Sequence, residues 1–580
     1  MVRLLDERVP RTLDQLVTKL HDSSFRGSRV QAWLFEDVEE RRAAERTLAT
    51  AGVHARFRSA YKPLVHFFLE ELNLADLSQV TVRYPVHNAA LRQRFLLEAY
   101  PLAALVNGAE IQFIAGESDR SYDIEARDRS GQSHEYRVFA PNRLRTDYIG
   151  ERALSPTGWL KVEGRPDNLP NIDEPLETEF ELAFRKAMAA ISAHRWPREE
   201  PYFDVLRVRV ETPGIERRLD IGDECMSTHE ALHEDIYFSV LEFCQRRSGR
   251  AIGDRRLQPG QIVPEVRRSR EPRVIVELQS HACHDDPRRS NVPLEAADAP
   301  MSLPQVHREL ALLGGQAFCG LSRQGRPVRG AYWAGWRPPI LLTAGQHANE
   351  TSGVVGALRA ARRLLERDAH FAIIPVENPD GYVLHGELCV DNPRHMHHAA
   401  RYTALGDDLE YRTEAPWFEK GARLEALRIS GAQLHVNLHG YPAHEWTRPL
   451  TGYVPRGFEF WTVPKGFFLI MRHRRGWAEQ AMALIEEVTF RLAQSPELVA
   501  VNRAQIEAFR AHSDGTPFTL YNDIPCLITE SEHGLTPLTL ITEFPDETIY
   551  GASFRFAHTV QMETVLAVED AFSAMMRPAV

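Results

Sequence analysis

Short apolar runs alternate with helical stretches from Leu310 to the end of the chain. The apolar runs occupy residues 340–343, 371–376, 434–438, 526–529 and 538–542, and the helical stretches occupy 352–366, 477–492 and 556–571. Buried strands separated by helices are typical of an α/β domain whose sheet is mixed, mostly parallel and flanked by helices. Because binding sites in such sheets form at the carboxyl ends of the strands, polar residues that follow the apolar runs are the first candidates for function.

The N-terminal half has a less regular pattern. In residues 1–160 we expect helices at 41–51 and 61–74 and strands at 111–115 and 135–139. In residues 170–290 we expect helices at 177–194 and 228–247 and a strand at 203–210. The sequence therefore predicts one or two α+β domains of unknown role before a third domain at 302–580. The stretch 280–304 is rich in Pro, Asp, Arg and Ser, which predicts a linker or an exposed loop.

Charge and composition restrict the class of protein. The 580 residues include 69 Lys and Arg against 80 Asp and Glu, a net charge of -11, whereas a nucleic-acid binder needs a basic footprint. No run of about 18 apolar residues predicts a membrane span, and the first residues lack the apolar core of a signal peptide. Six cysteines without C-x-x-C spacing favour reduced thiols. We therefore expect a cytoplasmic protein that binds neither nucleic acid nor membranes.

A histidine and a glutamate follow the apolar run that ends at Gly345. His347 and Glu350 have the spacing H-x-x-E, and a helix rich in small residues is expected directly after them. A strand-to-helix corner can direct an imidazole and a carboxylate at one point, which suits a zinc ion. A polar loop without metal explains the same residues equally well. His439 also follows an apolar run, at the strand end where binding residues gather.

A competing zinc motif, H-E-x-x-H, begins at His229. On a helix, His229 and His233 would share a face and Glu230 would be placed as a base. The motif lies in the first turns of a helix that Ser227 or Thr228 is expected to cap, where acidic residues are favoured. No third ligand follows at a familiar spacing. We interpret the motif as a polar helix start and keep a protease that uses His229 and His233 as a weaker alternative.

Two other polar clusters receive non-catalytic interpretations. The histidine-rich run at 395–398 precedes a helical stretch, so we expect a substrate-facing loop or a packed polar turn there. The basic run at 472–475 precedes the helical stretch at 477–492 and is interpreted as a solvated helix start.

The motifs of the C-terminal half, taken in order, resemble those of the zinc carboxypeptidase (funnelin) family. Residues 320–328 match the pattern G-x-S-x-x-G-R-x-V. The H-x-x-E of His347, N-P-D-G-Y at 378–382, G-x-D-L at 406–409, the strand-end His439 and a late strand-end glutamate then follow in the family's order. The resemblance covers about residues 302–580 and rests on the order of the motifs. The first half resembles no known family.

The resemblance implies one zinc ion held by His347, Glu350 and His439, with a fourth position left for water. It also implies that Asp408 bonds a ligand histidine and fixes its tautomer and orientation. Taken without the resemblance, Asp408 would be an ordinary acidic residue of a loop.

The resemblance further implies a general base at the end of a late strand. Glu543 is the first choice, because a single long helix follows it to the C-terminus, as in the family's layout. Glu530 is the alternative, because the strand before it also resembles the family's strand. Both glutamates end a Leu-Ile-Thr-Glu sequence, so the local sequence leaves both open.

The segment that would bind a substrate carboxylate departs from the family pattern. Glu410 and Tyr411 stand where the family's carboxypeptidases have Asn-Arg, and a glutamate repels a carboxylate. Arg412, one residue on, is a candidate to replace the carboxylate-binding arginine, although a shift of one residue on an extended segment points a side chain the other way. Arg394 or Arg401 would take the carbonyl-polarising role that the resemblance implies, so the candidate substrate-binding residues are Glu410, Arg412, Arg394 and Arg401. If Glu410 contacts the substrate, a positively charged or hydrogen-bond-donating group would replace the carboxylate.

The family resemblance predicts a zinc metallocarboxypeptidase-like hydrolase that cleaves a peptide or related amide bond with a metal-activated water. Its partner would be a peptide or small amide substrate, and the sequence does not indicate an oligomeric state. The alternatives are an amidase or deacylase of a small acylated amino acid, and a non-catalytic binding protein on the same fold.

Overall fold

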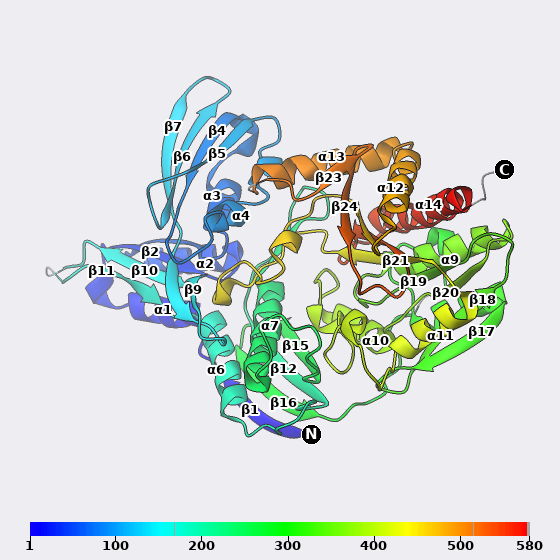
Figure 1. Ribbon diagram of the computed structural model, residues 1–580. Coiled ribbons are helices and arrows are strands. Elements are labelled where there is room, and N and C mark those ends of the chain that lie inside the picture. Colours follow the sequence, from blue (N-terminus) through cyan, green and yellow to red (C-terminus); the bar gives the residue numbers. More distant parts are fainter. Residues whose placement is uncertain (167–168, 290, 514, 577–580) are drawn as a thin grey trace.

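The computed structural model describes residues 1–166, 169–289, 291–513 and 515–576, and its C-terminal half is built around one large sheet (Figure 1). In the described residues this sheet has nine strands, in the order β17-β18-β20-β19-β21-β25-β22-β24-β23. The neighbouring strands β20, β19, β21 and β25 are parallel, and antiparallel pairs flank them. The predicted mixed α/β fold is confirmed. The strands are β17 (Gln316–Leu321), β18 (Pro327–Trp333), β19 (Ile340–Ala344), β20 (Phe371–Ile374), β21 (Leu434–Tyr441), β22 (Phe468–His473), β23 (Thr519–Tyr521), β24 (Ile524–Glu530) and β25 (Leu538–Pro545).

Helices cover both faces of the large sheet. One face packs on a group of helices that includes α9, α12 and α14, and the other face packs on α11. Because β21 is enclosed on both faces and both edges, its eight residues are all buried, and this burial explains the continuous apolar runs in the sequence. The helices of this half are α8 (Leu303–Leu313), α9 (Ser352–Leu365), α10 (Pro379–Asp391), α11 (Lys420–Ser430), α12 (Ala478–Leu492), α13 (Pro496–Ala511) and α14 (Ala552–Met575).

Smaller sheets with helices form the N-terminal half, as the α+β prediction requires. One sheet has the order β1-β16-β12-β15, a second β11-β10-β2-β3 and a third β5-β4-β6-β7. Their strands are β1 (Val2–Arg8), β2 (Arg29–Leu34), β3 (His54–Ser59), β4 (Leu77–Tyr84), β5 (Glu110–Ala115), β6 (Ser121–Asp128), β7 (Ser133–Phe139), β10 (Gly158–Glu163), β11 (Ile172–Leu176), β12 (Val205–Thr212), β15 (Gln261–Arg268) and β16 (Arg273–Gln279). Two short pairs join β8 (Asn142–Thr146) to β9 (Arg152–Pro156) and β13 (Glu216–Arg218) to β14 (Cys225–Ser227).

The helices of the N-terminal half pack on these sheets. α6 (Glu179–Ala193) and α7 (Thr228–Ser248) pack on the first sheet, and α1 (Thr12–Leu20) and α2 (Val38–Thr50) on the second. α3 (Pro63–Glu71), α4 (Arg94–Glu98) and α5 (Leu102–Leu105) pack on the third. Helices and strands thus lie close to the positions expected from the sequence.

Strand pairing crosses the predicted boundary near residue 160. β1 pairs with β16 at the far end of the N-terminal half, and β10 pairs with β2. The predicted division into 1–160, 170–290 and 302–580 remains a prediction. The stretch 280–304 contains little regular structure apart from the short helix η4 (Leu294–Ala296), in keeping with a linker or loop.

One apolar cluster joins the two halves. Leu232 and Phe238 of α7 belong to the same buried cluster as Met396, Trp446 and Leu450 of the C-terminal half. Figure 1 shows α7 beside β12 and β15, with α6 on its other side, and α7 also contacts the segment after β21 at residues 449–451. This packing brings N-terminal residues beside the carboxyl ends of the parallel strands. No helix in the described part of the chain is long and apolar enough to cross a membrane.

Candidate metal centre

A tight corner after β19 places His347 and Glu350 side by side. The chain turns at Gly345, whose φ is 59°, and a Cβ added there would lie 3.2 Å from the Cα of Val376, so glycine suits the position. α9 begins only at Ser352, which leaves both side chains in the corner. β21 runs parallel beside β19, so His439 lies at the same edge of the sheet.

The donor atoms of His347, Glu350 and His439 converge on one point. Nδ1 of His347 is 2.7 Å from Oε1 of Glu350, and Nδ1 of His439 is 2.8 Å from Oε2 of Glu350. The two Nδ1 atoms are 3.0 Å apart, and all three residues are buried. Burial lowers the pKa of His439, whereas the pKa of His347 is raised, because Glu350 and Asp408 outweigh its burial. A bound metal needs both imidazoles in the neutral form. Two histidines and one glutamate are a donor set of catalytic zinc sites, so these residues fit the zinc that the motifs imply.

Asp408 lies behind His347. Its Oδ2 is 3.6 Å from Nε2 of His347, the ring nitrogen that faces away from Glu350. Gln346 holds the carboxylate by donating from Nε2 to Oδ1 at 3.2 Å. Although burial alone would raise the pKa of Asp408, the nearby imidazole of His347 and the charge of Arg255 hold that pKa below the usual range. Asp408 is thus placed to orient the imidazole.

Sheet order separates the two candidate bases. Glu543 is in register with His439 on the neighbouring strand β25, and alternation along the strands turns both side chains toward one cavity. Burial and the charge of Glu350 raise the pKa of Glu543 well above its ordinary value. Glu530 ends β24, which β25 and β22 separate from β21, and it is exposed. The structure brings Glu543 to the candidate metal ligands and leaves Glu530 away from them.

The cavity in front of the metal ligands combines aromatic and charged side chains. Three arginines, Arg255, Arg401 and Arg472, lie in its wall. The other lining residues are Gln346, His347, Asp408, Glu410, Tyr411, Asn437, His439, Phe458, Trp461, Ile470, Thr539, Ile541 and Glu543. The cavity can therefore receive a substrate that has both an apolar and an anionic part.

Two of the predicted substrate-binding residues lie in this cavity. The Nη1 atom of Arg401 donates to Oε1 of Glu350 at 2.6 Å, so Arg401 stands directly beside a candidate ligand. Glu410 accepts a bond of 2.5 Å from Nη1 of Arg423, and this ion pair neutralises its charge. Glu410 is therefore less suited to bind a cationic substrate than its sequence position indicated.

The other two predicted arginines lie outside the cavity. Arg412 is 3% exposed, and its guanidinium donates to Asp407 and Glu419 at 2.7 Å each. Arg394 lies near Asp223, with 3.8 Å between the charged atoms. Neither residue lines the cavity, so their placement does not support substrate binding.

Two cavity arginines were missed by sequence reasoning. Arg255 comes from the loop between α7 and β15, and its guanidinium lies 5.3 Å from the ring centre of Tyr411 and 3.8 Å from Oδ2 of Asp408. Arg472 lies on β22, and it has no ion-pair partner within the described residues. No local pattern marks Arg255. The continuous apolar run from Phe467 to Met471 before Arg472 could have indicated a buried strand in place of the solvated helix start.

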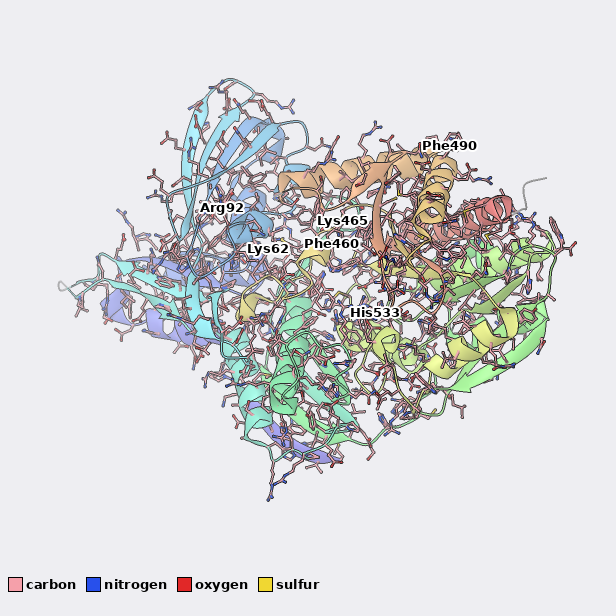
Figure 2. The ribbon with its side chains drawn as sticks, viewed as in Figure 1. Lys62, Arg92, Phe460, Lys465, Phe490 and His533 are labelled. Carbon is pink, nitrogen blue, oxygen red and sulfur yellow. The ribbon has the colours of Figure 1, made fainter. Side chains whose placement is uncertain are left out.

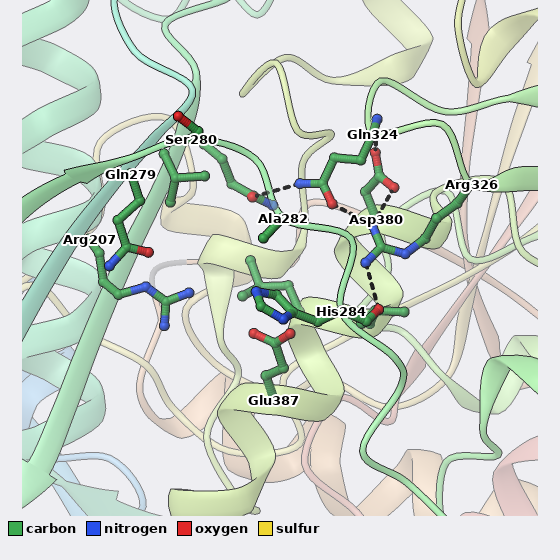
Figure 3. A pocket seen from close by; sticks show the side chains of 13 residues that line it. Arg207, Gln279, Ser280, Ala282, His284, Gln324, Arg326, Asp380 and Glu387 are labelled. Atoms are coloured by element: carbon green, nitrogen blue, oxygen red, sulfur yellow. Dashed lines mark hydrogen bonds and ion pairs between the residues drawn. The ribbon is translucent and has the colours of Figure 1, made fainter. Parts of the chain in front are cut away.

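Two of the sequence motifs bond each other away from the metal ligands. Asp380 accepts bonds from Oγ of Ser322 at 2.7 Å, from the backbone N–H of Gln324 at 2.9 Å and from Nη1 of Arg326 at 2.9 Å. Figure 3 shows Gln324, Arg326 and Asp380 of this network beside a second cavity, which lies between β12, β16 and α10. The G-x-S-x-x-G-R and N-P-D-G motifs thus attach the turn after β17 to the start of α10.

The H-E-x-x-H residues do not share a metal site. Nδ1 of His229 bonds Oε1 of Glu216 at 2.9 Å, whereas the ring of His233 lies 5.7 Å from that of His397. No metal-binding group in the described part of the chain contains both His229 and His233. Ser227 caps α7 by accepting from the N–H of Glu230 at 2.9 Å, so the helix-start interpretation is confirmed.

The histidine-rich run at 395–398 is a packed turn. All four of its residues are buried, and His397 has a positive φ of 53°. Nε2 of His397 lies 2.7 Å from the carbonyl oxygen of Asn392. The run lies outside the cavity of the candidate metal centre.

A comparison with models of protein families identifies the segment of this chain that is related to a known family. Residues 318–423 match the family model described as zinc carboxypeptidase. The predicted resemblance is confirmed for this segment. The matched segment includes His347, Glu350 and Asp408. The N-terminal part of the chain matches no family model. No curated protein matches the chain.

Solved structures similar to this chain include metallocarboxypeptidases at low sequence identity. The metallo-carboxypeptidase from Burkholderia cenocepacia is 15% identical, over 53% of this chain and 76% of that one, with a TM-score of 0.30. The metallo-carboxypeptidase from Pseudomonas aeruginosa is 15% identical, over 47% and 70%, with a TM-score of 0.28. The carboxypeptidase A from Helicoverpa armigera is 10% identical, over 54% and 91%, with a TM-score of 0.31.

Proposed function

We propose that this protein is a zinc-dependent hydrolase of peptide or related amide bonds, with His347, Glu350 and His439 as the metal ligands. The convergence of their three donor groups within 4.8 Å, at one end of a parallel sheet, carries the proposal. When bound, zinc supplies Lewis-acid chemistry by lowering the pKa of a water and polarising a carbonyl group. The match of residues 318–423 to zinc carboxypeptidases supports the same reaction class.

Glu543 is the proposed general base. It faces the cavity beside His439 and is 7% exposed, so it can take a proton from the attacking water and return it to the leaving amine. Arg401 is the proposed electrostatic partner of the reacting carbonyl, because its guanidinium lies against Glu350 and lines the same cavity. Asp408 acts through His347 by holding the imidazole in one orientation.

The proposed substrate carries a carboxylate near the bond that is cleaved. Arg472 faces the cavity without an ion-pair partner in the described residues, and Arg255 extends into the cavity from the N-terminal half. Arginine binds carboxylates through two parallel N–H bonds. These two arginines would take over the function of the Asn-Arg pair that is absent at Glu410 and Tyr411. The rings of Phe458 and Trp461 would contact the apolar part of the substrate.

Mass spectrometry of peptide mixtures tests the proposed function. The zinc-loaded protein should release residues from peptides with a free C-terminus, and Glu543→Gln should release almost none while keeping its metal. N-acylated amino acids tested in parallel distinguish a deacylase from a peptidase. If the zinc-loaded protein cleaves neither class, the non-catalytic binding protein is the better account.

A further inference from the structure

A second group of metal-binding side chains lies where the two halves of the chain meet. Cys225 comes from β14, Glu230 from the first turn of α7, and His444 from the segment after β21. One donor atom of each lies within 4.8 Å of the others. None of the three belongs to the candidate metal centre described above, and Cys225 is the only sulfur donor in either group.

The surrounding contacts orient two of the three side chains, His444 and Glu230. Nε2 of His444 is 2.6 Å from Oε2 of Glu230, while Nδ1 of His444 is 3.1 Å from Oγ1 of Thr548. Oε1 of Glu230 accepts from the backbone N–H of Met396 at 2.5 Å. A hydrogen bond to the outer atom of a histidine or carboxylate is the usual way in which a protein orients a metal ligand.

The chemistry of the three donors suits a zinc ion. Thiolate, imidazole and carboxylate are all zinc ligands, and a thiolate excludes calcium and magnesium in favour of softer cations. One thiolate and one carboxylate would balance the two positive charges of zinc. This balance matters because Glu230 is 3% exposed and His444 is 0% exposed, and a buried charge must be compensated.

We propose that Cys225, Glu230 and His444 form a second zinc site, which ties α7 and β14 to the loop that follows β21. The strand before this loop ends at Tyr441, two residues after His439. Thr548 follows Glu547, whose Oε1 is 3.5 Å from Nη1 of Arg401. The second ion would therefore fix the junction of the two halves close to the first metal centre. A fourth position remains for water, since three side chains supply the donors.

Another cysteine and histidine pair provides a matched control. Sγ of Cys389 is 3.3 Å from Nε2 of His385, but no third donor joins this pair in the described part of the chain. It has the thiol-to-imidazole contact without the complete ligand set. If a close Cys–His contact were enough to bind metal, Cys389 would bind it as well.

Cobalt substitution of the full-length protein tests the second site directly. A cobalt–thiolate bond gives a charge-transfer absorption in the near ultraviolet, and the first ligand set has no sulfur to produce it. We expect this band in the wild-type protein, in Cys389→Ser and in His347→Ala. Cys225→Ser should lose the band, and it should bind one equivalent of metal less than the wild-type protein. If cobalt-loaded wild-type protein lacks the band, or if Cys225→Ser keeps it, the proposal is wrong.

Thiol labelling serves as a second measurement in case Cys225→Ser does not fold. In the zinc-loaded wild-type protein, Cys225 should resist a thiol reagent, and removal of zinc with a chelator should expose it to labelling. Equal labelling of Cys225 with and without zinc contradicts the proposal. Because both readouts follow the sulfur ligand, they are independent of whether the first metal centre catalyses hydrolysis.

Discussion

Glu543 lies directly opposite His439 across the parallel pair of β21 and β25. The register of this pair sets the relationship, because a slip of one residue would turn Glu543 to the other face of the sheet. The same face carries Asn437 and Ile541 into the cavity. The proposed base and a proposed metal ligand are therefore positioned by one strand pairing at the centre of the sheet.

Replacing the proposed base should abolish turnover without removing the metal. For Glu543→Gln we expect kcat to fall by roughly 10²- to 10⁴-fold, the usual contribution of a general base, with unchanged zinc content. Glu530→Gln is the matched control and should keep nearly full activity, because Glu530 is exposed on β24. Steady-state kinetics and metal analysis of both variants test this prediction, and the opposite pattern would assign the role to Glu530.

Arg472 should recognise a carboxylate of the substrate. Arg472→Ala should raise KM by roughly 10- to 100-fold for peptides with a free C-terminus, since a hydrogen bond to a charged group contributes about 1.5–3 kcal/mol. C-terminally amidated versions of the same peptides should show little change. An equal loss for both substrates would mean that Arg472 does not contact the carboxylate.

Arg255 should contribute to binding from the N-terminal half. Arg255→Ala should raise KM severalfold, because Arg255 lines the cavity against Tyr411 and Asp408. Arg256→Ala is the control. The Arg256 side chain, next to Arg255 in the sequence, is 60% exposed and pairs with Asp254. Kinetics with a single peptide substrate suffice, and identical behaviour of the two variants would contradict a role for Arg255.

Lys465 should make stability depend on pH. Lys465 is 0% exposed, and its ammonium group lies 4.3 Å from the ring centre of Phe460 (Figure 2). Burial lowers the pKa of Lys465 to about 7, although the charge of Glu543 opposes this shift. Between pH 7 and the unfolded pKa of about 10.5, the unfolded chain holds a proton that the folded chain has lost. The free energy of unfolding should therefore rise with pH over that range.

Denaturation at several pH values tests this prediction. Lys465→Met should lose the rise, which is at most about 5 kcal/mol across the range. Lys19→Met should keep the wild-type dependence, because Lys19 is exposed. Parallel stability profiles for the wild-type protein and Lys465→Met would show that Lys465 does not titrate in this way.

The sequence predicted the residues whose positions depend on local structure. His347 and Glu350 occupy a strand-to-helix corner only three residues apart, and His439 follows an apolar run, so local patterns made all three candidates. The family resemblance then implied that they form one ligand set. Glu543 and Glu530 end identical Leu-Ile-Thr-Glu sequences. Only the sheet order distinguishes them, and strand order depends on long-range pairing that a local pattern does not contain.

The positions of the cavity arginines also depend on long-range packing that a local sequence pattern does not contain. Arg255 lies about ninety positions before the metal motif and reaches the cavity only because α7 packs against the C-terminal half. Conversely, Arg412 is close in sequence to Asp408 but is held by Asp407 and Glu419. Closeness in sequence made Arg412 a candidate for substrate binding, whereas tertiary packing places Arg255 in the cavity.

Metal analysis in a Cys225→Ser background tests the central claim most directly, because this background leaves only the first ligand set. We predict one equivalent of zinc in Cys225→Ser and almost none in Cys225→Ser with His347→Ala, with peptide hydrolysis lost together with the metal. An unchanged zinc content after the loss of His347 would contradict the assignment of His347, Glu350 and His439 as the metal ligands.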